Sequence, residues 1–143
     1  MAIRIRRLHL SDYDPLVELF RLSGVEPRVK GRDSRAAIAN QLRSKRNVYL
    51  GALDGDRLIG AVFGTHDTRK GWINRLAVDP EYRRQGIAAR LVQATERGLR
   101  KQGIQMFAAL IEPENAASAA VFRSLGYDVD PILYARRKLR ETI

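Results

Sequence analysis

The stretch that decides the fold runs from residue 74 to residue 89 and reads NRLAVDPEYRRQGIAA. It begins inside an apolar strand, residues 72–78, which an Asp-Pro pair ends because proline cannot donate to a sheet. A basic loop with Arg83 and Arg84 follows, and a helix begins after Gly86. The first N–H groups of a helix have no acceptor within the helix, and glycine lets an anion approach them closely. The stretch therefore predicts a phosphate-binding turn between a strand and a helix.

Two common nucleotide-binding motifs are absent from the sequence. The pattern GxxxxGK[ST] does not occur, and no two glycines stand two positions apart as GxGxxG requires. Residues 83–88, RRQGIA, instead match the pattern [Q/R]-x-x-G-x-[G/A]. This segment resembles the acetyl-CoA motif of the GNAT N-acetyltransferase superfamily.

The resemblance extends beyond this motif and covers essentially the whole chain. Residues 76–82, LAVDPEY, are similar to the fourth strand of the family and its exit. Residues 115–127 are similar to its second motif, in which an asparagine begins a helix that ends in Leu-Gly-aromatic. Residues 72–78 and the ending of the chain also resemble a group of small bacterial GNAT proteins without an assigned acceptor.

Apolar periodicity along the chain predicts a mixed sheet covered by helices. We expect strands near residues 3–8, 48–53, 58–65, 72–78 and 105–111, two short final strands within 127–139, and helices that begin after Ser11, Ser34, Gly86 and Asn115. An Asp-Gly turn at residues 54–56 predicts a hairpin, and the strand-helix-strand order over 72–111 predicts a parallel pair. The expected class is α/β with an α+β mixed sheet. The resemblance implies a GNAT-like single domain over residues 1–143, with about seven mostly antiparallel strands, a parallel fourth and fifth strand, and about four helices.

The resemblance implies acetyl-CoA as co-substrate, admitted where the fourth and fifth strands separate. Main-chain groups of the fourth strand would bind the pantetheine amides, and the N–H groups at the helix start would hold the pyrophosphate. The residues implied to bind acetyl-CoA are Leu76, Ala77, Val78, Arg83, Arg84, Gln85, Gly86, Ile87, Ala88, Ala89 and Asn115.

The implied reaction is direct acetyl transfer to a primary amine of an unidentified acceptor, a small molecule, a protein N-terminus or a lysine. The amine must be neutral to attack, so a base or a water relay is useful. Glu112 is the candidate catalytic base, because it follows the fifth strand and has the same strand parity as Leu110, where one branch of the family has its glutamate. The alternative reading of Glu112 is a solvated loop carboxylate.

Phe122 departs from the family pattern. Many relatives have a tyrosine seven residues after the motif asparagine, and its hydroxyl protonates the departing thiolate; phenylalanine cannot donate that proton. Because thiolate is a tolerable leaving group near neutral pH, we expect a lower rate rather than no reaction. Tyr127 and Tyr134 are substitutes for this acid or, more simply, structural aromatic residues.

Composition limits the remaining function classes. The chain has no cysteine, which excludes disulfides, thiol nucleophiles and cysteine-ligated metals, and its two histidines make us expect no metal site. No apolar run approaches the ~20 residues that span a bilayer, and residues 1–10 lack the apolar core of a signal peptide. We therefore expect a cytoplasmic protein without membrane contact.

The net charge of +10, with 26 Lys and Arg, is spread over both halves of the chain. Such a surface attracts phosphorylated ligands, nucleic acid and acidic partners alike, and it argues against polybasic acceptors. Two alternatives to the enzyme stay open: a non-catalytic acyl-CoA-binding or sensor module, and a basic nucleic-acid-associated protein. The family resemblance is also compatible with a homodimer.

Overall fold

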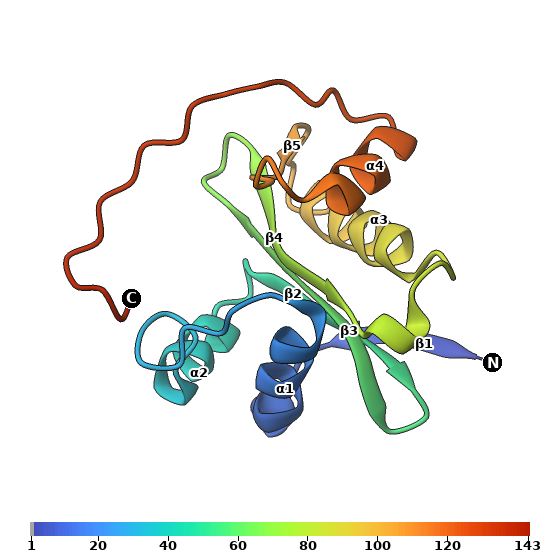
Figure 1. The fold of residues 1–143 in the computed structure, drawn as a ribbon, viewed down its shortest axis with the longest axis vertical. Helices are drawn as coiled ribbons and strands as arrows, with labels where there is room; N and C mark the ends of the chain where they lie inside the picture. Colours follow the sequence, from blue (N-terminus) through green and yellow to red (C-terminus); the bar gives the residue numbers. More distant parts are fainter. Residues whose placement is uncertain (1) are drawn as a thin grey trace.

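The computed structural model describes residues 2–143, and Figure 1 shows the order of its elements. The strands are β1 (Ile3–Arg7), β2 (Val48–Asp54), β3 (Arg57–His66), β4 (Gly71–Val78) and β5 (Phe107–Ala108). The helices are α1 (Tyr13–Ser23), α2 (Arg35–Arg43), α3 (Ile87–Arg100) and α4 (Ala116–Ser124), with short 3-10 turns η1 (Leu10–Asp12) and η2 (Pro80–Tyr82).

The strands form one sheet in the order β1-β2-β3-β4-β5. All neighbours are antiparallel except β4 and β5, which are parallel. The β2–β3 hairpin turns at Gly55, whose φ of 60° is the conformation that the Asp-Gly pair predicted. Helix α3 joins β4 to β5, so the predicted mixed α/β sheet and its crossover unit are confirmed.

The sheet is smaller than expected, with five strands over residues 2–143 instead of about seven. The predicted strand 105–111 pairs only at Phe107–Ala108, and the two final strands within 127–139 do not form. Residues 128–143 instead run as an extended segment from the end of α4 to the neighbourhood of α2 (Figure 1). A further strand would have to form hydrogen bonds with β5 at the edge of the sheet, and β5, with two residues, is too short to pair with it. Pro131 also removes one donor from the segment.

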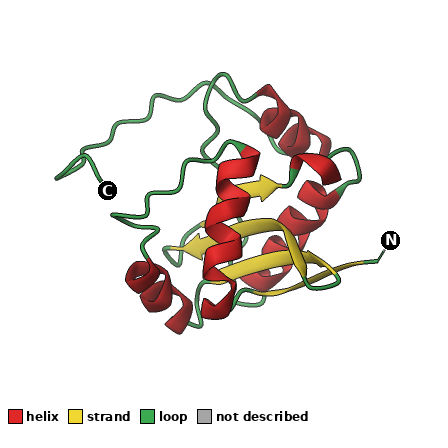
Figure 2. Ribbon diagram, turned by 60° about the horizontal axis from the view of Figure 1, so that its bottom comes forward, coloured by secondary structure: helices red, strands yellow, loops and turns green. Residues whose placement is uncertain are grey.

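Helices cover both faces of the sheet, as Figures 1 and 2 show. On one face, α1 buries Leu19 and Phe20 against the sheet, with the Phe20 ring edge-on to Phe63 at 5.8 Å between centroids. On the other face, α3 buries Leu91 and Val92 in a separate apolar cluster. Helix α4 packs beside α3. Apolar clusters on both faces therefore hold the sheet between them.

The caps of α1 and α2 compare differently with the sequence. Ser34 caps α2, because its Oγ accepts a hydrogen bond from the Ala37 N–H at 3.1 Å, as predicted. The predicted helix after Ser11 forms and begins at Tyr13, but Ser11 does not cap it, because Ser11 lies inside the 3-10 turn η1 and Asp12 is the N-cap. The Asp12 carboxylate there accepts the His9 N–H at 2.8 Å and pairs with Arg6. Within residues 2–143, no helix is both long and apolar enough to cross a membrane.

Candidate active site

Strand β4 carries a bulge in the middle of its pairing with β3. Asn74 and Ala77 pair with residues of β3 that are two apart, so Val62 between them faces two residues of β4. Arg75, in this gap, has a φ of 55°, which side chains other than glycine rarely adopt. A bulge bends its strand and leaves one residue outside the hydrogen-bond ladder. The main chain of β4 can therefore bind a ligand just beyond Arg75.

The strands β4 and β5 separate soon after they meet. They pair through Gly71 with Phe107 and through Trp72 with Ala108, and β5 then ends while β4 continues to Val78. Within residues 2–143, the second half of β4 thus has β3 on one side and no strand on the other. This separation lies where the family resemblance predicts that acetyl-CoA enters.

The start of α3 presents backbone donors at the end of this gap. Gly86 is the N-cap, with a φ of 75°, and the first helical hydrogen bond runs from the Arg90 N–H to the Gly86 carbonyl at 3.1 Å. The N–H groups of Ile87, Ala88 and Ala89 therefore have no acceptor within the helix. A Cβ built on Gly86 would meet no heavy atom within 4 Å, so the space beside these donors is open.

Side chains of the hairpin hold the loop before α3 in place. Asp79 is buried, accepts the Glu81 N–H at 2.9 Å and forms an ion pair with Arg57 at 2.9 Å. The Tyr82 hydroxyl donates to the Asp54 carboxylate at 2.6 Å, and this hydrogen bond raises the pKa of Tyr82. Asp79 thus also anchors the loop to the hairpin. Sequence reasoning missed this role, because the partner of Asp79, Arg57, is 22 residues away.

One cleft of about 850 Å³ lies between the second half of β4, the start of α3 and α4. It is lined by nearly all the residues that the sequence assigned to acetyl-CoA, namely Leu76, Ala77, Val78, Arg83, Arg84, Gly86, Ile87, Ala88, Ala89 and Asn115. Gln85 does not line it. The end of α1, Ser23 to Val25, closes one side and was not predicted; the Arg83 guanidinium donates to the Ser23 carbonyl at 3.2 Å.

Asn115 begins α4, as the sequence indicated, and its side chain caps the helix. Its Oδ1 accepts a hydrogen bond from the Ser118 N–H at 3.1 Å, while its own N–H donates to the Glu112 carbonyl at 2.9 Å. Because Oδ1 is used in the cap, the Nδ2 amide is the part of Asn115 with hydrogens left to donate to a ligand.

Glu112, the candidate base, lines the same cleft as an exposed residue. The strand-parity argument that related it to Leu110 is wrong, since β5 ends at Ala108 and Glu112 lies in the following loop. Glu112 lies beside the residues assigned to acetyl-CoA. Its role as the base stays a prediction. Within residues 2–143, no cluster of three or more histidine or carboxylate side chains is arranged to hold a metal ion.

Phe122 and the two tyrosines considered as proton donors lie in different surroundings. Phe122 is 3% exposed and packs edge-on against Tyr127, with 4.9 Å between ring centroids. The Tyr127 hydroxyl donates to the Glu96 carboxylate at 2.5 Å, and burial together with this hydrogen bond raises the pKa of Tyr127. Tyr134 is exposed and lies in the extended C-terminal segment. The hydroxyl of Tyr127 is therefore engaged within the protein, and neither tyrosine lines the cleft.

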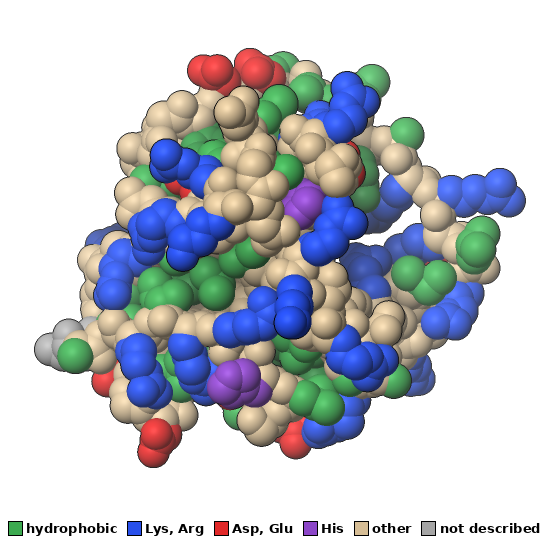
Figure 3. Space-filling view, turned by 180° about the vertical axis from the view of Figure 1, so that it is seen from behind, with side chains coloured by type: hydrophobic (Ala, Val, Ile, Leu, Met, Phe, Trp, Pro, Cys, Tyr) green, Lys and Arg blue, Asp and Glu red, His purple; other side chains and the backbone are tan. Residues whose placement is uncertain are grey.

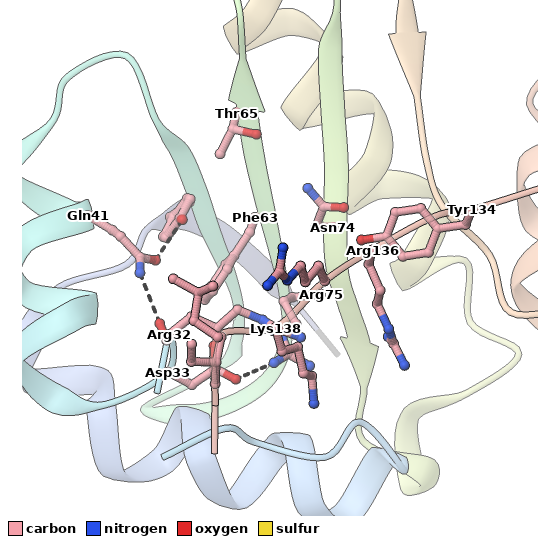
Figure 4. Close-up of a pocket in the computed structure, with 14 residues that line it drawn as sticks. Arg32, Asp33, Gln41, Phe63, Thr65, Asn74, Arg75, Tyr134, Arg136 and Lys138 are labelled. Atoms are coloured by element: carbon pink, nitrogen blue, oxygen red, sulfur yellow. Dashed lines mark hydrogen bonds and ion pairs between the residues drawn. The ribbon is translucent and has the colours of Figure 1, made fainter. Parts of the chain in front are cut away.

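A second hollow, of about 590 Å³, lies on the α1 and α2 face of the sheet, and we call it the basic pocket. Figure 4 shows its side chains from β3 and β4 on one side and from the C-terminal segment on the other. Its lining is Arg32, Asp33, Gln41, Tyr49, Phe63, Thr65, Asn74, Arg75, Tyr134, Arg136, Arg137, Lys138, Leu139 and Ile143. Asn74 and Arg75 directly precede Leu76 of the cleft, so the two hollows adjoin at the bulge of β4.

A buried ion pair and an aromatic stack form the floor of the basic pocket. Arg75 pairs with Asp33, and burial lowers the pKa of the guanidinium although Asp33 opposes that shift. The Tyr49 ring stacks on Phe63 at 3.9 Å between centroids. The Tyr49 hydroxyl donates to the Gln41 side chain at 2.8 Å, and burial raises its pKa to about 12. Tyr49 therefore stays protonated over the physiological range.

Comparisons with known proteins agree with this geometry. The family model described as acetyltransferase (GNAT) family matches residues 13–127. N-alpha-acetyltransferase 30 of Schizosaccharomyces pombe is 40% identical to this chain over 81 residues. The match covers 53% of this chain and 54% of that relative, about half of its length. An acetyltransferase of Pectobacterium atrosepticum is 27% identical over 143 residues, covering 99% of this chain and 98% of that protein. The crystal structure of the PaiA N-acetyltransferase from Thermoplasma acidophilum in complex with coenzyme A superposes with a TM-score of 0.83, at 25% identity over 91% of this chain and 92% of that one.

Proposed function

The chain belongs to the acetyltransferase (GNAT) family, and from this premise we propose that it transfers the acetyl group of acetyl-CoA directly to a primary amine. The observation that carries the proposal is the cleft, in which unpaired N–H groups of α3 face the same space as the unpaired edge of β4. Acetyl-CoA is the co-substrate.

The residues of the cleft fit a ligand with a pyrophosphate at one end and amides along its arm. Open space beside Gly86 and the unpaired N–H groups of α3 suit the phosphates, and Arg83 and Arg84 add positive charge. The free edge of β4 offers main-chain groups to the pantetheine amides, as a neighbouring strand would. When bound, acetyl-CoA supplies an acetyl group activated as a thioester.

In direct acetyl transfer, the main task of the protein is to orient the amine and the thioester. The amine nitrogen forms a bond to the acetyl carbonyl carbon, the carbon–sulfur bond breaks, and the proton lost by the amine ends on the sulfur of CoA. Main-chain N–H groups next to the bulge polarise the carbonyl, and Glu112 or a water relay takes the proton. Thiols have a pKa of ~8.5, so the sulfur leaves without an acid at the position of Phe122.

A second candidate is a module that binds acyl-CoA without turnover. It is favoured by Phe122, which places a buried ring without a hydroxyl where many relatives have an acid. A role with nucleic acid stays a prediction from the net charge of +10. Figure 3 shows basic side chains spread over much of one face, among hydrophobic and uncharged ones.

One experiment separates these candidates. Acetyl-CoA is titrated in a thermal-shift assay, and thiol release is then followed with pooled amines, amino acids and peptides with free N-termini. The enzyme predicts a higher melting temperature and amine-dependent thiol release; a shift without release supports the sensor, and no shift at millimolar acetyl-CoA overturns both. Glu112→Gln should lower kcat at pH 7 at least tenfold, whereas Glu18→Gln, outside both hollows, should not.

A further inference from the structure

The side chains that line the basic pocket have an uneven charge. Five of these side chains are basic and only one is a carboxylate, and the main-chain carboxylate of Ile143, which also lines the hollow, accepts a hydrogen bond from Arg28 at 3.0 Å. The basic residues are Arg32, Arg75, Arg136, Arg137 and Lys138, and the side-chain carboxylate is Asp33. A hollow that bound a diamine or a lysine-rich peptide would need carboxylates, because each ammonium must be matched by opposite charge as it leaves water.

The one side-chain carboxylate is already engaged. Asp33 is 4% exposed, forms the ion pair with Arg75 and accepts the Arg28 N–H at 2.8 Å. Since its negative charge is neutralised inside the protein, it does not compensate a second cation. Asp33 therefore cannot serve as the anchor of a positively charged acceptor.

The other basic side chains have no such partner. Among residues 2–143, no carboxylate side chain lies within ion-pair distance of Arg32, Arg136, Arg137 or Lys138. They come from two distant parts of the chain, the loop before α2 and the C-terminal segment, which meet over the same hollow (Figure 4). Contacts between these parts hold this arrangement, since Arg28 donates to the Glu141 carbonyl at 2.6 Å and to the main-chain carboxylate of Ile143 at 3.0 Å.

The basic pocket adjoins the cleft at the bulge of β4, where Asn74 and Arg75 line one hollow and Leu76 the other. An amine that reaches the thioester from this side leaves the rest of its molecule in the basic pocket. We infer that the acceptor carries an anionic group, a carboxylate or a phosphate, which binds the unpaired basic side chains while its amine points to the bulge. This inference rests on the proposed acetyl transfer.

The same charge helps the reaction. Positive neighbours disfavour the protonated form of an amine, so they lower the pKa of the bound acceptor. A larger fraction of it is then neutral and able to attack, which reduces the work left for a base.

Three amines of equal chain length provide the test: 5-aminopentanoate, 5-amino-1-pentanol and 1,5-diaminopentane. Binding to the CoA-loaded protein is measured by calorimetry, and turnover by thiol release from acetyl-CoA. We expect the Kd of 5-aminopentanoate to be at least tenfold lower than that of the diamine, with the alcohol between them. O-phosphoethanolamine compared with β-alanine shows whether phosphate or carboxylate is preferred.

Matched variants separate the pocket from the overall charge. Arg136→Gln with Lys138→Gln removes two charges from the pocket and should raise the Kd of 5-aminopentanoate at least fivefold. Arg100→Gln with Lys101→Gln removes two exposed charges outside both hollows and should leave that Kd within twofold.

Each outcome decides one of the two claims. Equal or tighter binding of the diamine, or no measurable binding of 5-aminopentanoate, overturns the inference, even where the diamine is acetylated and acetyl transfer itself stands. Preferential binding of the carboxylate without turnover of any amine supports the inference about the pocket and overturns the proposed reaction.

Discussion

Replacing Gly86 by alanine tests the anion-binding role of the start of α3. Gly86 has a φ of 75°, and alanine in this left-handed region costs about 1–2 kcal/mol. Gly103, just beyond the other end of α3, has a φ of 88°, and a Cβ on either glycine meets no heavy atom within 4 Å. Gly86→Ala and Gly103→Ala should therefore lose similar stability and melt roughly 3–6 °C below the wild type.

The two variants should differ in binding, because only Gly86 lines the cleft. A methyl group beside the N–H groups of α3 keeps a phosphate from its closest approach, and we expect the Kd for acetyl-CoA to rise at least tenfold, which is about 1.4 kcal/mol. At a concentration of 100 times the wild-type Kd, acetyl-CoA stabilises the wild type by about 2.7 kcal/mol. The same concentration should stabilise Gly86→Ala by about 1.4 kcal/mol or less.

The assay is a fluorescence melting curve of each protein with and without acetyl-CoA. Gly103→Ala should keep the full wild-type increase in melting temperature, while Gly86→Ala should show about half of it or less. Equal increases in the two variants would refute the reasoning, because strain alone would then account for the role of Gly86.

Three other substitutions test the contacts around the site. Tyr127→Phe should cost about 1–3 kcal/mol in urea unfolding by removing the hydrogen bond to Glu96, while kcat stays within twofold. Arg75→Met should cost about 3–5 kcal/mol, because it leaves the Asp33 carboxylate buried and unpaired. The hydrogen bond from Arg6 lowers the pKa of Asp12. Ionised Asp12 therefore stabilises the fold at pH values above the ordinary carboxyl pKa of ~3.9. This contribution disappears as the pH falls through the lowered pKa. Unfolding of Asp12→Asn should therefore depend less on pH below about pH 4 than unfolding of the wild type.

Each of these expectations has a result that contradicts it. A large loss of kcat in Tyr127→Phe would make its hydroxyl the missing acid. Near-wild-type stability of Arg75→Met would show that the Asp33 carboxylate does not depend on Arg75 to compensate its charge. An unchanged acid profile in Asp12→Asn would place the acid sensitivity in other carboxylates.

Local patterns predicted the parts of the structure that depend on neighbours in sequence. The Asp-Gly turn, the Ser34 cap, the start of α3 at Gly86 and the start of α4 at Asn115 each follow from a few adjacent residues. The cleft also follows from them, because a strand and the next helix necessarily meet at their common turn.

Contacts between distant residues could not be predicted. The Arg75–Asp33 pair joins residues 42 apart, and nothing in the sequence signals an arginine in the left-handed region at a bulge. The apolar run near Met106 to Ile111 reads as a full strand, yet pairing stops at Ala108, where β4 and β5 separate. The basic pocket was missed for the same reason, since it forms only where the C-terminal segment meets the loop before α2.

The most direct test of acetyl transfer is a single-turnover reaction with acetyl-CoA carrying a ¹³C-labelled acetyl group, followed by mass spectrometry of the amine and of the intact protein. The account predicts one labelled N-acetyl product for each CoA released, only when an amine is present, and no label on the protein at any time. Label on the protein before it appears in the amine, or CoA release that does not depend on the amine, would contradict direct transfer within the cleft.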